Sequence, residues 1–431
     1  MFRTFLIFFK WIFFMFWFNW NYNKIKVDEL YAKSLKQKLE NLGILGIKLG
    51  QYLCNRKDIC SDIMKNELQS FLSSNKTHSF EHTKEILDNA MVNNLVIGDV
   101  IGSGSLTQTY LCNIEGNDDK LVLKVMHPEV KHLKTEISAL KRILKFFSYF
   151  GKYKILVNVD WEKFFHLIEQ QTDLNNEKKY MQKYYDIYNR KITEIEIPRF
   201  IQGNNEYILM TYCEGRPLNE ISRDSPLYDK AYYNFACSFM HTFFVHQIIH
   251  GDIHEGNVLV KDNGDVSIID FGICIELTED QYKGIFATSR FENNPTVESC
   301  LEFVNAVIEP HDIYGNKIDM YKLSKECSEE YVKYTKGKIQ ETINKFFNII
   351  IGFVQRYNVL MKGEILSYFL NMILIEALSP CKERINMTSF KAIILMKKNP
   401  FYVKELDFIL DEYYTELKKK FPDDLIEKYD V

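Results

Sequence analysis

The stretch His250-Gly251-Asp252-Ile253-His254-Glu255-Gly256-Asn257 is followed, after a short interval, by Asp270-Phe271-Gly272. The interval 258–269 has the composition of two strands joined by the turn Asp262-Asn263-Gly264. The side-chain amide of Asn257 and the carboxylate of Asp270, beyond the hairpin, are oxygen ligands that suit Mg²⁺ held against a phosphate. Their joint spacing makes a chance Asx-rich loop a poor explanation.

The same spacing follows the protein-kinase pattern H-x-D-x-x-x-x-N with D-F-G downstream. In that pattern Asp252 accepts or orients the attacking hydroxyl, and Asn257 and Asp270 hold Mg²⁺ against the phosphates. The metal charge matters because the protein gives the transferred phosphoryl group little covalent help. The sequence therefore predicts ATP and Mg²⁺ as cofactors.

A glycine-containing loop lies between two predicted strands, where a phosphate-covering loop belongs. Its candidate nucleotide-binding residues are Ile101, Gly102, Ser103, Gly104, Ser105, Leu106, Thr107, Gln108 and Thr109. Gly102 and Gly104 would let the backbone approach a phosphate, and the loop N–H groups would donate to it. A lone G-x-G is equally typical of a hairpin turn, but its place 20 residues before Lys124 favours the nucleotide loop.

Lys124 lies in the apolar strand Leu121–Val125. A lysine is rarely buried unless it is paired, and in kinases this lysine contacts the α- and β-phosphates and pairs with a glutamate on a helix. The alternative is a lysine on the solvated face of an edge strand. Proximity in the chain would make Glu136, on the following helix, its partner.

The order of predicted elements is that of a small sheet followed by a mainly helical region. Predicted strands are Leu95–Ile101, Thr109–Ile114, Leu121–Val125, Tyr207–Tyr212 and Val266–Ile269; predicted helices are Asp62–Leu72, Glu81–Met91, Val130–Tyr149, Trp161–Tyr188 and Tyr228–Gln247. The pattern is helical from Thr278 to the end, and we expect Pro310, Pro380 and Pro400 to interrupt the helices. We predict an α+β, two-lobed protein-kinase-like fold, with a helical extension at 24–93, an N-lobe at 94–212 and a helical C-lobe at 213–431.

Bulk composition excludes some classes of function. The 431 residues carry a net charge of −4 and a pI of about 6.2, without the basic excess of a nucleic-acid-binding protein. The nine cysteines are scattered and form no C-x-x-C pair, which favours buried thiols in a reducing intracellular setting over a disulfide framework or a cysteine zinc site.

Residues 1–23 are unusually apolar. From Phe5 to Trp20 only Lys10 and Asn19 are not apolar, and the stretch is slightly short of the ~20 residues that a spanning helix needs. We expect a membrane anchor or an interfacial helix. A helix buried against the protein and a processed targeting segment are the alternatives.

Several further motifs resemble the UbiB/ADCK atypical kinases. Lys48-Leu49-Gly50-Gln51 looks like the K-x-G-Q motif of that family, with Leu42-Gly43 before it and Arg56-Lys57-Asp58 after it. Lys124-Val125-Met126-His127-Pro128 resembles the family's strand-lysine segment, and Asp252–Asn257 resembles its D-x-H-P-G-N loop. The segment from Met210 to Leu218 resembles the family's hinge. The likeness runs from about residue 40 to 280.

The resemblance implies roles for individual residues. Lys124 would be the nucleotide lysine, Asp252 the catalytic aspartate, and Asn257 and Asp270 the metal ligands. Glu177, rather than Glu136, would pair with Lys124. Met210 and Tyr212 of the hinge would contact the nucleotide. In the family the K-x-G-Q helices fold over the catalytic cleft, so Lys48 and Gln51 would also reach toward the nucleotide.

This chain departs from the family pattern at three places. Gln171 stands where a glutamate is usual, Glu255 replaces the usual proline, and a Gly-Ser-Gly-Ser sequence replaces the Ala-rich nucleotide loop. The glycine at position 104 is closer to ordinary kinases and would favour ATP binding.

The resemblance implies an atypical kinase or ATPase that uses Mg-ATP, associates with a membrane and has a lipid, quinone-pathway or isoprenoid partner. A nucleotide-binding regulatory protein with negligible turnover is the first alternative, favoured by Gln171 and the atypical loop. The second is a small-molecule phosphotransferase of the aminoglycoside or choline-kinase type, which shares the loop His250–His254 but lacks the Lys48 motif.

Overall fold

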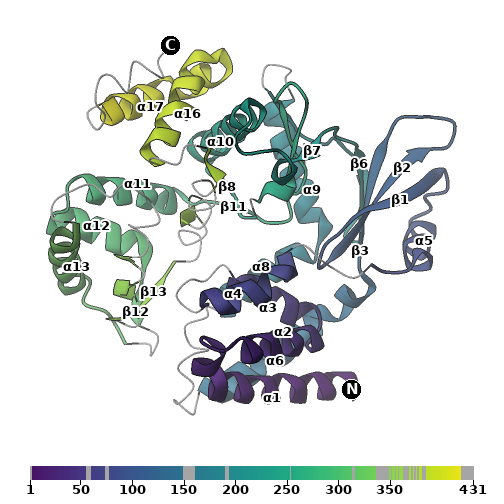
Figure 1. Cartoon of the computed structure of the whole chain (residues 1–431), viewed down its shortest axis with the longest axis horizontal. Coiled ribbons are helices and arrows are strands. Elements are labelled where there is room, and N and C mark those ends of the chain that lie inside the picture. The colour runs from purple at the N-terminus through teal and green to yellow at the C-terminus, as the bar shows by residue number, and fades with distance from the viewer. Residues whose placement is uncertain are drawn as a thin grey trace. The chain divides into compact units, whose positions relative to one another are not determined.

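The computed structural model describes residues 2–54, 60–72, 77–148, 161–189, 194–252, 254–312, 316–335 and 349–418, the last range with short gaps between 351 and 384. These residues form two compact units, coloured along the chain in Figure 1. The first unit comprises Met1–Lys179 and Arg199–Tyr212, and the second comprises Tyr180–Pro198 and Cys213–Val431. The predicted α+β class is confirmed.

The first unit begins with a group of helices. They are α1 (Phe2–Ile25), α2 (Glu29–Asn41), α3 (Ile44–Cys54), α4 (Asp62–Leu68) with the 3₁₀ turn η1 (Gln69–Leu72), and α5 (Phe80–Asn89). The sequence predicted helices at Asp62–Leu72 and Glu81–Met91, and both are confirmed to within a few residues. The flanking residues Arg56-Lys57-Asp58 lie outside the described part of the chain.

Helix α1 has one buried and one exposed side. It packs against α2 and against α6 (Leu133–Ser148) through Trp11, Phe14, Met15, Phe18 and Ile25, all buried. The opposite side exposes Phe9, Phe13, Phe16 and Trp20, which follow one another at helical spacing. Among the described residues, no helix combines the length and the apolar character needed to cross a membrane.

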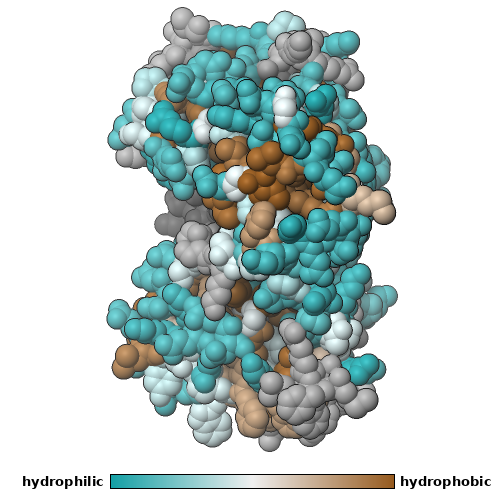
Figure 2. All heavy atoms as spheres, turned by 90° about the vertical axis from the view of Figure 1, so that its right-hand side faces the viewer, coloured by the Kyte–Doolittle hydropathy of each residue, from teal (hydrophilic) through white to brown (hydrophobic). Residues whose placement is uncertain are grey.

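The sheet of the first unit has five antiparallel strands in the order β1-β2-β3-β6-β5. They are β1 (Leu95–Ser103), β2 (Thr107–Ile114), β3 (Leu121–Met126), β6 (Tyr207–Thr211) and β5 (Phe200–Gly203). The predicted meander is therefore confirmed, although β1 continues two residues beyond its predicted end. Figure 2 shows apolar atoms gathered on the side where Figure 1 draws β1 and β2, and the edge strand β1 exposes Val96, Val100 and Ile101.

Helix α5 covers one face of this sheet. Side chains alternate between the two faces of a strand, so every second residue of β3 points toward the helix. The resulting core consists of Ile86, Leu87, Tyr110, Cys112, Leu121, Leu123, Val125, Tyr207 and Leu209. Val122, Lys124 and Met126 consequently belong to the other face of the sheet.

The helical segment after β3 is divided more finely than predicted. The 3₁₀ turn η2 (Pro128–His132) precedes α6, and the single helix expected over Trp161–Tyr188 is two helices, α8 (Trp161–Gln171) and α9 (Leu174–Tyr188). The break has a local cause, because the Asp173 carboxylate accepts a hydrogen bond from the Asn175 N–H at 3.0 Å and so starts a new helix.

The second unit is built around α10 (Pro226–His246), which is buried along most of its length. Short strands accompany it: β4 (Ile195–Glu196), β10 (Val266–Ile268), β9 (Val258–Val260) and β7 (Arg216–Pro217) in one sheet, and β11 (Cys274–Glu276) with β8 (Ile248–His250) in another. The 3₁₀ turns η3 (Leu218–Glu220) and η4 (Glu255–Asn257) connect them. Helix α10 and the strand at Val266 are confirmed.

The remaining described elements are mainly helical. They are α11 (Glu279–Asn293), α12 (Val297–Val307), α13 (Met320–Thr335), α16 (Ile385–Lys398) and α17 (Pro400–Lys418). The uninterrupted helical pattern predicted from Thr278 onward is wrong in one respect, because β12 (Ile308–Asp312) and β13 (Val359–Met361) pair antiparallel. Pro310 lies within β12, and its carbonyl accepts from the Ile318 N–H at 3.0 Å.

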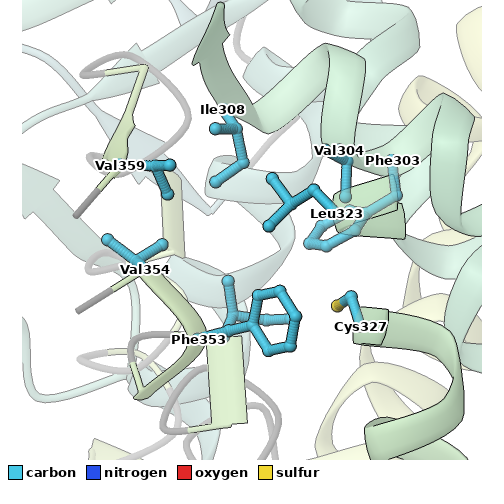
Figure 3. Close-up of a pocket in the computed structure, with 9 residues that line it drawn as sticks. Phe303, Val304, Ile308, Leu323, Cys327, Phe353, Val354 and Val359 are labelled. Atoms are coloured by element: carbon cyan, nitrogen blue, oxygen red, sulfur yellow. The ribbon is translucent and has the colours of Figure 1, made fainter. Parts of the chain in front are cut away.

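A small apolar pocket lies among the helices of this region. Figure 3 shows the side chains that line it, including Phe303, Val304, Ile308, Leu323, Cys327, Phe353, Val354 and Val359. Cys327 is also one of eight described cysteines, all of them free thiols and all but Cys60 buried. The expectation of buried free thiols is confirmed for the seven buried cysteines, whereas Cys60 is half-buried.

Gly46 permits the close crossing of α2 and α3, and its substitution tests that packing. A Cβ at this position would lie 2.0 Å from the Leu39 carbonyl oxygen, which belongs to the backbone of α2. We expect Gly46→Ala to destabilise the protein by ~1–3 kcal/mol through overpacking, despite a helix-propensity gain of ~1 kcal/mol. Urea unfolding provides the measurement.

The exposed helical Gly352 is the matched control, because a Cβ there would have no atom within 4 Å. Gly352→Ala should be neutral or slightly stabilising. An unfolding midpoint of Gly46→Ala at or above that of the unsubstituted protein would contradict the packing described for α2 and α3.

Candidate active site

In the first unit, a buried ion pair joins the sheet to α9. Lys124 Nζ lies 2.6 Å from Glu177 Oε1, and the two side chains are only 9% and 5% exposed. A buried charge is tolerated when it is paired, whereas removing one partner of such a pair typically costs ~3–5 kcal/mol. The structure therefore places beside Lys124 the glutamate that the family resemblance implied, while Glu136 lies on α6.

Lys124 shares its sheet face with a hinge residue. Val122 of β3 pairs with Met210 of β6, and both residues belong to the face opposite α5. On the other side of Lys124, Thr109 of β2 is its cross-strand partner. The sequence-predicted residues Thr109, Lys124 and Met210 are thus brought together on one surface.

The hinge continues to the end of the first unit. The Tyr212 N–H donates to the Lys120 carbonyl at 3.3 Å, and Lys120 Nζ lies 5.5 Å from the centroid of the Tyr212 ring. Tyr212 is therefore fixed at the start of β3 rather than within the strand pairing itself.

The glycine-containing loop is a tight hairpin between β1 and β2. The Gly104 N–H donates to the Thr107 carbonyl at 2.8 Å, so only three residues separate the two strands. Neither Gly102 nor Gly104 adopts a left-handed conformation, and a Cβ at either position would meet no atom closer than 3.6 Å. Neither the backbone conformation nor the packing therefore requires glycine at these two positions.

Histidines support this loop from behind, and sequence reasoning missed their role. His127 Nε2 donates to the Gly104 carbonyl at 3.1 Å. The other nitrogen, Nδ1, then accepts from His78 Nδ1 at 2.7 Å, and the His78 Nε2 lies 2.8 Å from the Thr83 hydroxyl. The His-Pro after Lys124 was the available signal for His127, whereas nothing in the sequence pointed to His78.

Burial keeps this cluster neutral. Desolvation, and after it the charges of His127 and His82, lower the pKa of His78 from 6.5 to about 4. Desolvation also lowers the pKa of His127.

Gln108 does not share the face of Lys124. Its side chain is 1% exposed, accepts from the His78 N–H at 2.8 Å and donates to the Tyr110 hydroxyl at 2.5 Å, on the side covered by α5. Gln108 is one of the nine loop residues predicted to bind nucleotide, but its side chain is hydrogen-bonded to His78 of the histidine cluster.

The K-x-G-Q motif lies within α3. Gln51 Nε2 donates to the Phe71 carbonyl at 2.7 Å, and a Cβ at Gly50 would lie 2.4 Å from the Phe71 ring. Lys48 is half-buried on the same helix. Gly50 is therefore a close-packing position in the middle of α3.

In the second unit, His250 connects the predicted catalytic loop to the Asp-Phe-Gly segment. Its Nε2 donates to the Asp270 carbonyl at 2.6 Å, so the Nδ1 of a neutral ring can accept from the Asp252 N–H at 3.4 Å. Burial lowers the pKa of His250, which favours that neutral ring. One imidazole thus fixes the backbone at both aspartates.

Further hydrogen bonds orient the predicted metal ligands. Asn257 Nδ2 donates to the Asp252 carbonyl at 3.0 Å, which turns the amide oxygen of Asn257 the other way. The Asp270 carboxylate accepts from the Gly272 N–H at 2.9 Å. An amide oxygen and a carboxylate are hard oxygen ligands, and this donor set fits Mg²⁺. Ile253, which follows Asp252 in the chain, lies outside the described residues.

Phe271 is completely buried beside these ligands. Its ring centroid lies 4.9 Å from that of Tyr184 on α9 and 5.7 Å from that of His250. This packing fixes the backbone between Asp270 and Gly272.

Glu255, which replaces the proline usual in the family, has a local partner. Its Oε1 accepts from Arg223 Nη2 at 2.8 Å, and the Tyr228 hydroxyl lies 3.4 Å from the same oxygen. The bond to Glu255 raises the pKa of Arg223. The ion pair between Glu255 and Arg223, which precedes α10, therefore restrains the loop at the position where the family has a proline.

Comparisons with known proteins show which family this chain is similar to. Residues 97–289 match the model of the ABC1 atypical kinase-like domain. The chain is 24% identical to the probable serine/threonine-protein kinase abkC of Dictyostelium discoideum, over 56% of this chain and 36% of that protein. It is 24% identical to the mitochondrial ABC1 family protein YPL109C of Saccharomyces cerevisiae, over 56% of this chain and 43% of that protein.

A bacterial relative and a solved structure are also similar. The probable protein kinase UbiB of Haemophilus ducreyi is 26% identical over 31% of this chain and 26% of its own length. The solved complex of Rv3197 with erythromycin from Mycobacterium tuberculosis gives a TM-score of 0.47 at 15% identity, covering 70% of this chain and 80% of that one. The chain spans less than half the length of the curated relatives named here.

The histidine cluster predicts a pH dependence of stability. Because the pKa of His78 is lower in the folded state than in the unfolded state, the unfolded chain binds more protons between pH 6.5 and about 4. We expect the free energy of unfolding to fall as the pH drops through this window. Urea unfolding at pH 7.5 and pH 5 should show a smaller fall for His78→Gln than for the unsubstituted protein.

His166→Gln is the control, because His166 is exposed on α8. The control should retain the full pH dependence. An equal fall in His78→Gln and in the unsubstituted protein would show that the cluster does not titrate as described.

Proposed function

Because this chain belongs to the UbiB/ADCK family of ABC1 atypical kinases, we propose that it binds Mg-ATP and transfers or hydrolyses the γ-phosphate. The observation that supports this best is the buried pair of Lys124 and Glu177, at 2.6 Å, on the sheet face that also carries Met210. A buried lysine that is oriented by a carboxylate on a helix is suited to hold the α- and β-phosphates.

The loop from Ile101 to Thr109 would cover the phosphates, with its N–H groups as donors. Lys48 and Gln51 on α3 would contribute to the nucleotide site from the extension. Asn257 and Asp270 would hold Mg²⁺, which when bound neutralises the charge of the phosphates.

Asp252 is the proposed catalytic base. The acceptor oxygen forms a bond to the γ-phosphorus, and the bond between that phosphorus and the β,γ-bridging oxygen breaks. ADP leaves with the electron pair, and Asp252 takes the proton of the acceptor hydroxyl. With water as acceptor the same step is ATP hydrolysis. His250 would position Asp252 through its backbone, since it accepts the Asp252 N–H.

We further propose an intracellular setting at a membrane surface, with an acceptor linked to quinone or isoprenoid-lipid metabolism. The acceptor class rests on the family resemblance, and relatives named as mitochondrial or chloroplastic support an intracellular site. The exposed aromatic side of α1 supports the membrane surface, because Phe and Trp on one side of a helix suit the lipid interface. Lys10, Lys24 and Lys26 would attract anionic lipid, and no acidic residue precedes Asp28.

Turnover should require Asp252. We expect Asp252→Asn to lower Mg-ATP phosphate release by at least ~100-fold, as the loss of a positioned base does, while nucleotide binding persists. The control is the same substitution at Asp262, which is fully exposed in the turn between β9 and β10. Phosphate release and nucleotide binding are measured on the full chain.

Lys124→Met should abolish nucleotide binding, and the double variant Lys124→Met/Glu177→Gln checks that an unpaired buried carboxylate is not the cause. Phosphate release that is equal in Asp252→Asn and in the unsubstituted protein would contradict the proposed base. Nucleotide binding without turnover in any form would favour the regulatory alternative.

Membrane binding should depend on the exposed side of α1. Phe13 and Trp20 are 69% and 86% exposed. Because burying one such side chain is worth ~1.5–3 kcal/mol, we expect Phe13→Ser/Trp20→Ser to weaken binding to anionic lipid vesicles by at least ~10-fold. Vesicle co-sedimentation of the full chain measures this.

Met91→Ser is the control, since Met91 is 84% exposed but belongs to the turn after α5. It should leave vesicle binding unchanged. Equal sedimentation of the α1 double variant and the control would refute the α1 surface as a membrane contact.

A further inference from the structure

Two histidines and a glutamate converge where α10 and α17 meet in the second unit. His241 and His246 lie in the last turns of α10, and Glu405 lies in the first turns of α17. One ligand atom from each of the three lies within 4.8 Å of the other two. We propose that these side chains form a zinc site that fastens α17 to α10, a role separate from the ATP chemistry proposed above.

The separations fit a tetrahedral ion after small side-chain rotations. Zinc bonds of ~2.0–2.1 Å at the tetrahedral angle place neighbouring ligand atoms roughly 3.3 Å apart. Here His241 Nε2 lies 3.0 Å from Glu405 Oε2, and His246 Nε2 lies 4.0 Å from the same oxygen. Two imidazoles and a carboxylate are a common zinc donor set, and the fourth position is open to water because His246 and Glu405 are 31% and 30% exposed.

The hydrogen bonds around His241 favour a cation. The Tyr188 hydroxyl donates to the Ser238 carbonyl at 2.9 Å, so its oxygen accepts the Nδ1–H of His241 at 3.1 Å. With Nδ1 as the donor, Nε2 of a neutral ring carries the lone pair that a metal ion needs, and it lies 3.0 Å from Glu405 Oε2.

The His241 ring is enclosed by aromatic side chains. Its side chain is fully buried, and the rings of Phe401 and Tyr402 lie 5.0 and 5.2 Å from its own. Tyr188 acts as the outer partner that fixes the tautomer of a metal-binding histidine.

The test measures zinc binding by the full chain after chelator treatment. Equilibrium dialysis against Zn²⁺ should give one more bound ion for the unsubstituted protein than for Glu405→Gln or His246→Ala, with an affinity loss of at least tenfold at this site. Zn²⁺ should also raise the melting temperature of the unsubstituted protein more than that of either variant. His241 is left intact because its burial makes substitution disruptive.

His311→Ala is the matched control, since His311 is exposed on β12. It should bind zinc like the unsubstituted protein. Co²⁺ distinguishes this site from the free cysteines, because imidazole and carboxylate ligands give visible d–d bands without a thiolate charge-transfer band. Equal zinc stoichiometry and equal melting shifts in the unsubstituted protein, Glu405→Gln and His246→Ala would overturn the proposal, as would a Co²⁺ spectrum that these two variants do not change.

Discussion

The burial of one positive charge constrains the first unit more than any other interaction. All six residues of β3 are buried, and Lys124 is among them. Its ammonium group must have a nearby anion, which α9 supplies through Glu177. The packing of α9 therefore depends on the identity of one strand residue. The same helix continues into the second unit, where its Tyr184 packs on Phe271.

Neutral histidine rings hold backbone segments in place through hydrogen bonds. His250 donates through one ring nitrogen to the Asp270 carbonyl and accepts through the other from the Asp252 N–H. His127 donates to the Gly104 carbonyl and faces His78 with its second nitrogen. In both cases burial lowers the imidazole pKa, so one ring presents a donor and an acceptor at once. Such a ring can hold two segments in place without bringing a charge into the core.

The departures from the family pattern have local compensations. Where the family has a stiff proline, this chain has Glu255, which is held by an ion pair with Arg223. The two glycines of the nucleotide loop have no close neighbours, so they are not required by the fold. Gly46 and Gly50 differ in this respect, because a Cβ at either would meet α2 or Phe71 at less than 3 Å. The glycines compared here are thus of two kinds, those that helix packing requires and those that it does not.

The sequence by itself determined the α+β class, the meander and the candidate residues around Asp252 and Lys124, because spacing along the chain is a local property. It also placed Lys124 on a strand without deciding between a buried and a solvated face. Only the tertiary structure decided that, since the partner, Glu177, lies 53 residues away. The same holds for His78 and His127, and for His241 and Glu405, which are 164 residues apart. A cluster of imidazoles and carboxylates leaves no sequence signature when its members come from different elements, whereas a catalytic loop carries its ligands within a few consecutive residues.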